Sequence, residues 1–211
     1  MKLLRPHPGL LLASYVAAAL LVSASRAGDM PTLDCNSTFP PSTSVDSLRE
    51  RFGARNVASV DVDVGEGIHE SGTVLFAESP QRRLEFIWKD KRNQRDVRLV
   101  RSQGEAGAWR TIHGLTLGTD LRTLEKVNGV PFELAGFDWD YSGTVTSWAG
   151  GLLDDPFGVC SMTVRLAPEL HDDDPVMSQW HDHVIGDRTF SSNHPAMQEL
   201  NPRIYSIEFS Y

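Results

Sequence analysis

The spacing of apolar residues marks the first helix of this chain. Val45, Leu48 and Phe52 recur at intervals of three and four residues, which is the period of one face of an α-helix. Ser44 precedes them, and a serine at this point accepts hydrogen bonds from the first unpaired backbone N–H groups. Gly53 follows them and suits the left-handed conformation in which many helices end. The pattern predicts a helix over residues 45–52.

A second pattern, the strict alternation of apolar and polar residues, marks the strands. Val60, Val62 and Val64 alternate with two aspartates, as in a strand that buries only one face. Similar runs predict further strands and one more short helix. The further strands cover residues 73–76, 83–88, 162–166 and 203–211, and the short helix covers 195–200.

The second half of the chain follows the same order as the first. Thr119 or Asp120 precedes another helical spacing of apolar residues, which ends at Gly129. Moving the first helix forward by 76 residues places Ser44 on Asp120 and Gly53 on Gly129. The second helix therefore matches the first from its cap to its end.

A short identity supports an internal repeat. The tetrapeptide Ser-Gly-Thr-Val at 71–74 recurs at 142–145, in the same order relative to the helices. We therefore expect an α+β fold made of two tandem helix-plus-antiparallel-sheet repeats with a C-terminal strand extension. The repeats cover about 45–100 and 113–166, the extension covers 167–211, and together they form one domain, 45–211.

The N-terminus has the features of an export signal. Lys2 and Arg5 precede an apolar run over 10–22, which is shorter than the roughly 20 residues that cross a bilayer. Small residues then allow cleavage after Ala27. We expect residues 1–27 to be a signal peptide and the mature protein to be periplasmic or secreted, with no stable membrane anchor.

The chain contains only two cysteines, Cys35 and Cys160. In an oxidising compartment an even number of cysteines favours a disulfide, and the alternative is a pair of free buried thiols. A closed loop of more than 100 residues is worth on the order of 4 to 5 kcal/mol. Cys35 lies in a proline-rich segment, 28–44, which we expect to be an extended lead-in.

Composition and charge narrow the classes of partner. Hydrophobic residues make up 40% and charged residues 23%, which is typical of a globular chain and excludes a disordered or multi-span membrane protein. The net charge is −8, and removal of the basic leader makes the mature chain more acidic still. Such a surface repels phosphate backbones, so nucleic acid is not expected as a partner.

Two motifs resemble known families. Residues 117–124, followed by Asn-Gly-Val-Pro at 128–131, resemble the short helical motif of small β-barrel-assembly lipoproteins, and the duplicated unit resembles the two-repeat β-lactamase inhibitor proteins of the same fold group. A closer likeness is to a family of exported bacterial proteins of unassigned function, which carry runs similar to 128–132 and 136–143. The resemblance implies a fold rather than an activity. The chain lacks the lipid-bearing cysteine of the lipoproteins, so the resemblance does not imply a lipid anchor.

Aromatic residues provide the first candidate site. Trp139, Tyr141 and Trp148 lie close together in sequence and beside several glycines. Large rings with a polar tip are common in binding surfaces, and they are equally common in the core of a small sheet. Both interpretations stay open, and these three residues are the candidates for contact with a protein or peptide ligand.

Histidines provide the competing candidate. His181 and His183 would lie on one side of an extended segment, with His171 and several aspartates nearby, and these side chains suit zinc or copper. The spacing matches no known metal signature. The sequence also lacks a nucleophile elbow, a zinc-protease motif and a phosphate loop, so we assign no catalytic residue and no cofactor.

The leading interpretation is therefore a soluble exported protein that serves as a binding or scaffolding module of the cell envelope. Its concave sheet face, near the three aromatic candidates, would hold a protein or peptide. The alternative is a metal-binding protein or metal-dependent enzyme built on the histidine region. Alanine at His181 and His183 separates the two, because it abolishes metal uptake only under the alternative.

Overall fold

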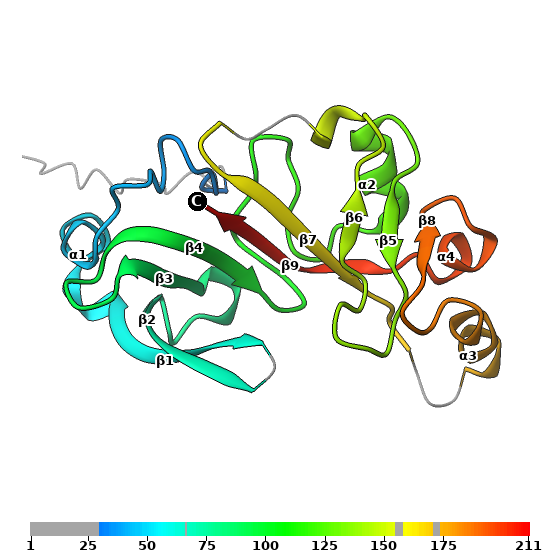
Figure 1. The fold of residues 1–211 in the computed structure, drawn as a ribbon, viewed down its shortest axis with the longest axis horizontal. Coiled ribbons are helices and arrows are strands. Elements are labelled where there is room, and N and C mark those ends of the chain that lie inside the picture. The colour runs from blue at the N-terminus through cyan, green and yellow to red at the C-terminus, as the bar shows by residue number, and fades with distance from the viewer. Residues whose placement is uncertain (1–29, 66, 155–157, 171–173) are drawn as a thin grey trace, which may run out of the picture.

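The computed structural model describes residues 30–65, 67–154, 158–170 and 174–211. The expected signal peptide and His171 lie outside the described residues. The described chain combines helices with antiparallel sheets, which confirms the α+β class (Figure 1). The helices are α1 (Val45–Phe52), α2 (Leu121–Asn128), α3 (Pro175–Asp182) and α4 (Pro195–Leu200).

Six strands form the main sheet, in the order β1-β2-β3-β4-β9-β7, and all neighbours are antiparallel. These strands are β1 (Val57–Gly65), β2 (Ile68–Leu75), β3 (Leu84–Asp90), β4 (Arg95–Gln103), β7 (Ser161–Ala167) and β9 (Arg203–Ser210). A smaller sheet has the order β6-β5-β8. Its strands are β5 (Glu133–Ala135), β6 (Val145–Ser147) and β8 (Thr189–Ser191). A bridge between Thr144 and Arg165 connects the smaller sheet to the edge strand β7.

The first two helices begin and end where the sequence predicts. The hydroxyl of Ser44 accepts from the backbone N–H of Ser47, whose own hydroxyl accepts from the backbone N–H of Ser44, so α1 starts with a capping box. Of the two candidate caps for α2, Asp120 takes the role by accepting from the Thr123 N–H at 2.9 Å. Gly129 ends α2 with a φ of 83°.

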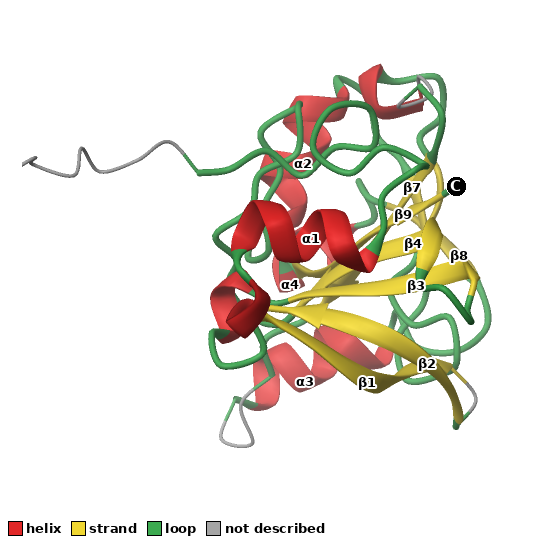
Figure 2. Ribbon diagram, turned by 90° about the vertical axis from the view of Figure 1, so that its left-hand side faces the viewer, coloured by secondary structure: helices red, strands yellow, loops and turns green. Residues whose placement is uncertain are grey.

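The core lies between the helices and one face of the main sheet. Figure 2 shows α1, α2 and α4 on one side of the strands. Phe86, Val100 and Phe209 pair across β3, β4 and β9 and are fully buried, which places this row against the helices. The helices contribute buried apolar side chains to the same core, among them Leu48, Leu121, Leu124 and Met197. The opposite face of the sheet has no such cover from these helices.

The two predicted repeats use their strands differently. β1 to β4 lie side by side in the main sheet, whereas β5 and β6 belong to the smaller sheet and β7 to the main one. The tandem repeat is therefore not confirmed. The recurring tetrapeptide has a local reason: a Cβ on Gly72 would collide with the carbonyl oxygen of Phe86, and one on Gly143 with that of Leu166. At both positions a neighbouring strand lies too close for any residue except glycine.

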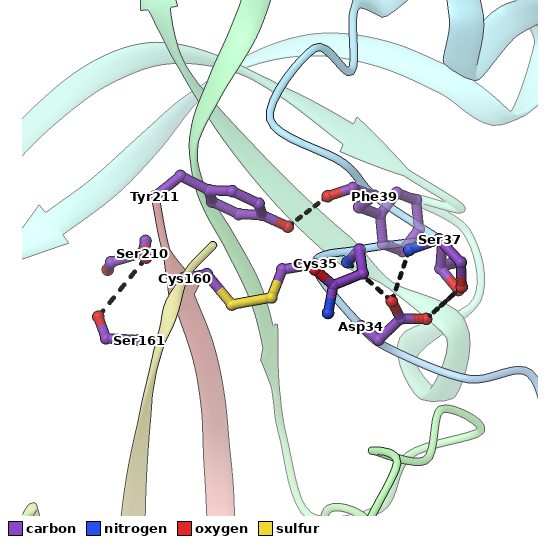
Figure 3. Close-up of a disulfide and its surroundings, with 10 residues drawn as sticks. Asp34, Cys35, Ser37, Phe39, Cys160, Ser161, Ser210 and Tyr211 are labelled. Atoms are coloured by element: carbon purple, nitrogen blue, oxygen red, sulfur yellow. Dashed lines mark hydrogen bonds between the residues drawn. A yellow bond between two sulfur atoms is a disulfide. The ribbon is translucent and has the colours of Figure 1, made fainter. Parts of the chain in front are cut away.

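The structure confirms the predicted disulfide. Cys35 is bonded to Cys160 over a sequence separation of 125 residues (Figure 3). Cys160 directly precedes β7, so the bond fastens the N-terminal segment to the edge of the main sheet.

The N-terminal segment packs as part of the domain. Leu33 is 1% exposed and Phe39 is fully buried, so residues 30–44 contribute to the core and do more than lead into it. The hydroxyl of the C-terminal residue, Tyr211, donates to the carbonyl oxygen of Phe39 (Figure 3). Burial raises the pKa of this hydroxyl, and the Asp34 carboxylate acts in the same direction. The C-terminal residue is therefore held against the N-terminal segment.

Candidate functional site

The candidate site lies on the face of the main sheet that the helices leave open. Strand side chains alternate between the two faces, so the register decides which of them share a face. Glu85 pairs with Arg101, Arg101 with Glu208, and Glu208 with Thr163. These residues alternate with those of the core, and they form one row across β3, β4, β9 and β7 on the open face.

The β1–β2 hairpin bends over this face and forms one wall of a groove. Arg101 donates from Nη2 to the carbonyl oxygen of Asp63 at 2.6 Å, and Arg98 donates to Glu70 at 2.9 Å. Both contacts join β4 to the hairpin without passing through β3, which lies between them in the sheet. The hairpin must therefore curl over the sheet, and Gly72 allows it by leaving room for the close approach of β3. The groove so formed has a volume of about 190 Å³.

The lining of the groove has an apolar part and a charged part. Val62 and Ile87 are almost fully buried, and Val64 and Leu99 extend this apolar part. The charged and polar part includes Arg98, Arg101, Arg165, Tyr205 and Glu208. A ligand in the groove would meet both kinds of surface.

Two carboxylates hold most of the cations around the groove. Glu85 accepts from Arg101 at 2.7 Å and from Arg83 at 2.9 Å. Glu70 lies 2.8 Å from Lys91 and 2.9 Å from Arg98, and the hydrogen bond from Lys91 lowers the pKa of Glu70. These cations already have partners in the protein.

Arg165 and Glu208 differ from these pairs. Within the described residues, neither side chain has a hydrogen bond or an ion pair within 4.0 Å. Glu208 is half-buried, and this burial raises the pKa of its carboxyl group although the charges of Arg101, Arg165 and Arg98 act in the opposite direction. The groove thus contains one guanidinium and one carboxyl that are not committed to internal pairs.

Two of the predicted aromatic residues border β7. Trp139 and Tyr141 lie in the turn between β5 and β6, with their ring centroids 5.4 Å apart. Tyr141 is 55% exposed, so it is not a core residue. The turn ends at Gly143, whose carbonyl oxygen accepts from the N–H of Leu166 at 2.9 Å, next to Arg165 in β7. The aromatic turn is therefore fastened beside a residue that lines the groove.

The third aromatic candidate packs in the core. Trp148 is 8% exposed, and its ring centroid lies 5.4 Å from that of Phe132. Its carbonyl oxygen accepts from the side chain of Asn128 at 2.9 Å. The contacts of Trp148 thus stabilise the junction of α2 with the loop after β6.

The histidine candidates do not form the expected extended pair. His181 belongs to α3 and His183 follows its end, so the two side chains do not share a side as they would in a strand. His181 is 8% exposed, stacks on Phe137 and has its Nε2 atom 3.5 Å from Oδ1 of Asp138, whereas His183 is exposed. In the part of the chain that the structure describes, no group of three His, Cys, Asp or Glu side chains could hold a metal ion. His171 lies outside that part.

Sequence analysis did not single out Arg165, Arg101 or Glu208. Arg165 and Glu208 are polar residues on the outward faces of predicted strands, which is the usual position of a solvated side chain, and Arg101 lies in β4, which was not predicted. These residues could be found because their side chains point to the same face of neighbouring strands. Recognising this requires the order of the strands in the sheet, which the sequence does not show. Strand β9, which lies between β4 and β7 in the sheet, comes from the end of the chain.

Two further results concern the whole chain. None of the described helices combines the length and the apolar character that a membrane crossing requires. In comparisons with known proteins, no family model matches the chain, and no curated protein and no solved structure matches it.

Proposed function

We propose that this protein is an exported binding module that holds an extended peptide segment of a partner protein in the groove on the open face of its main sheet. The observation that carries the proposal is a curled sheet whose open face combines apolar side chains with an arginine and a glutamate outside internal pairs. Such a lining offers contact area together with polar groups that fix the orientation of a ligand.

The aromatic turn supports the same surface. Trp139 and Tyr141 lie in a turn attached to β7 beside Arg165, and Tyr141 exposes a large ring. Rigid aromatic side chains contribute much contact area at a small cost in conformational entropy. We assign these two residues to the rim of the binding surface.

Export is the second part of the proposal. The basic, apolar and small-residue segments at the N-terminus favour secretion to the periplasm or the medium. The bond between Cys35 and Cys160 suits an oxidising compartment. The partner is therefore expected in the cell envelope or outside the cell.

A metal site is the alternative function, and one contact favours it. His181 lies 3.5 Å from Asp138, and two ligands of this kind belong to the donor set of zinc. The binding proposal is better supported, because more charged and apolar side chains meet in the groove than around His181. Stoichiometric zinc or copper in the purified protein, lost in a His181→Ala variant, would reverse this order.

The proposal predicts that a bulky side chain in the groove blocks peptide binding. The row from Glu85 to Thr163 spans three strand spacings of about 4.8 Å each, so a hexapeptide in extended conformation is long enough to cover it. We expect immobilised full-length protein to enrich members of a random library of acetylated hexapeptides. A Gln103→Trp variant should lose at least about tenfold in affinity for them, because Gln103 is exposed and lines the groove, and the indole would fill space there.

Thr146→Trp is the matched control, because Thr146 is exposed on β6 and makes no contribution to the groove lining. Circular dichroism and a thermal melt of both variants establish that they are folded. Equal enrichment by the two variants, or no enrichment by the wild-type protein, would refute a peptide-binding groove.

A further inference from the structure

We propose that the groove selects an acidic peptide segment, with a carboxylate of the ligand on Arg165 and apolar ligand side chains on Val64 and Leu99. This inference rests on the proposed function and adds the chemistry of the partner to it. It follows from the balance of charge around the groove, from the pairing of each charged group and from the position of the apolar residues.

Positive charge exceeds negative charge at this face, although the chain as a whole has a net charge of −8. Among the residues that line the groove, the cations are Arg98, Arg101 and Arg165, and the carboxylate is Glu208. Glu70 and Glu85, which pair with Arg98 and Arg101, are also paired with the further cations Lys91 and Arg83. A local excess of positive charge on an acidic protein attracts a ligand of the opposite sign and disfavours basic ones.

The pairing of these groups points to Arg165 as the ligand contact. Glu85 holds Arg83 and Arg101, and Glu70 holds Arg98 and Lys91. Arg165 has no such partner in the described chain, and a guanidinium binds a carboxylate in a bidentate manner when both of its N–H edges are available. Arg165 can therefore bind a ligand carboxylate without breaking an internal ion pair.

Glu208 has the opposite sign and would repel such a ligand in its ionised form. Its neighbours on the open face are Arg98 and Arg101 from β4 and Arg165 from β7, and burial still raises the pKa of its carboxyl group. An approaching carboxylate raises this pKa further, so Glu208 takes up a proton as the acidic ligand binds. Binding should then strengthen as the pH falls.

The apolar part of the groove sets the second requirement on the ligand. Val62 and Ile87 are buried, so the apolar surface that a ligand can reach belongs to Val64 and Leu99, which are partly exposed. Val64 lies in the hairpin strand β1 and Leu99 in β4, whereas Arg165 lies on the edge strand β7. A ligand that fits both ends carries apolar residues at one end and acidic residues at the other.

The test uses the same library of acetylated hexapeptides on the full-length protein at pH 7. The inference predicts enrichment of peptides that contain Asp or Glu together with Leu, Ile or Val. In the most enriched peptide, changing every Asp and Glu to Asn and Gln should weaken binding at least about tenfold, as measured by isothermal titration calorimetry.

Two charge variants test the residues. Arg165→Gln should weaken binding of this peptide about tenfold, and Glu208→Gln should strengthen it about threefold to fivefold at pH 7. Lys126→Gln, which removes an exposed cation from α2, should leave the affinity unchanged. If the ligand were basic, both effects in the groove would have the opposite sign.

The pH dependence of binding tests the role of Glu208 directly, because a residue with only a structural role would not change it. The affinity of the wild-type protein should rise as the pH falls toward the raised pKa of Glu208, because the protonated carboxyl no longer repels the acidic ligand. The Glu208→Gln variant should lack the part of the pH dependence of affinity that comes from this carboxyl group. All other groups, including His69 on β2, are the same in both proteins, so the comparison isolates the contribution of Glu208.

The outcomes separate this inference from the function beneath it. Enrichment of basic or uncharged peptides that Gln103→Trp abolishes would overturn the acidic ligand and leave the binding groove intact. An unchanged affinity in both Arg165→Gln and Glu208→Gln would also overturn it. If the wild-type protein enriches no peptide at all, the proposed function fails together with the inference.

Discussion

Replacing Cys35 and Cys160 by alanine is expected to lower the free energy of unfolding by about 5 kcal/mol. The disulfide closes a loop over a sequence separation of 125 residues, and in the loop-entropy account the stabilisation grows with the length of the closed loop. The bond also holds the N-terminal segment, with the buried Phe39, against the main sheet. Chemical denaturation of the wild-type protein and the double variant, followed by tryptophan fluorescence, measures the difference.

Wild-type protein treated with reductant is the natural control, since it loses the covalent bond and keeps both side chains. It should unfold at nearly the same denaturant concentration as the double alanine variant. A midpoint that does not move in either sample would show that the disulfide does not stabilise this fold.

Asn128→Ala is expected to cost about 3 kcal/mol of stability. The side chain of Asn128 is 2% exposed, donates to the carbonyl oxygens of Val130 and Trp148 at 2.9 Å each, and accepts from the N–H of Leu153 at 3.1 Å. Alanine would leave buried backbone groups without partners, and each unpaired group costs about 1 to 3 kcal/mol. A thermal or chemical unfolding curve gives the value.

Asn193→Ala serves as the matched control, because Asn193 is exposed, and its stability should equal that of the wild type. Asn128→Asp should fall between wild type and alanine, since it can still accept from the Leu153 N–H but can no longer donate. A loss below about 0.5 kcal/mol for Asn128→Ala would contradict the assigned role.

Local signals were sufficient to predict α1, α2, α4 and most strands of the main sheet, whereas α3 and the central strand β4 were not predicted. The helical spacing with Ser44 and Gly53 at its ends predicted α1, and the same logic predicted α2 up to Gly129. The two cysteines predicted the disulfide because no other pairing exists. These features depend on residues close in sequence or on a count, and both are visible without the fold.

Long-range arrangement was not visible in the same way. The Asn-Gly-Val-Pro run predicted the end of a helix, but the side chain of Asn128 binds a loop 20 to 25 residues away. The tetrapeptide at 71–74 and 142–145 suggested a repeat, whereas the glycines share a need for space beside another strand. Such contacts depend on which strands become neighbours, and the alternation within each strand carries no information about that.

None of the three predicted aromatic residues lines the groove. A concave sheet face was expected, and Tyr141 is exposed beside β7, but Trp148 packs in the core. The charged row of the open face was missed, since Arg101 and Glu208 come from strands that are more than 100 residues apart in sequence. Neither strand alone distinguishes a ligand contact from a solvated side chain.

The central claim is that the open face of the main sheet binds a peptide, and chemical shift mapping tests it most directly. Full-length ¹⁵N-labelled protein is titrated with the most enriched hexapeptide, and backbone amide shifts are followed. The account predicts that the largest shifts lie in β3, β4, β7 and β9, along the row that contains Glu85, Arg101 and Glu208. Shifts confined to α3 and the loops around it, with none in this row, would contradict the account.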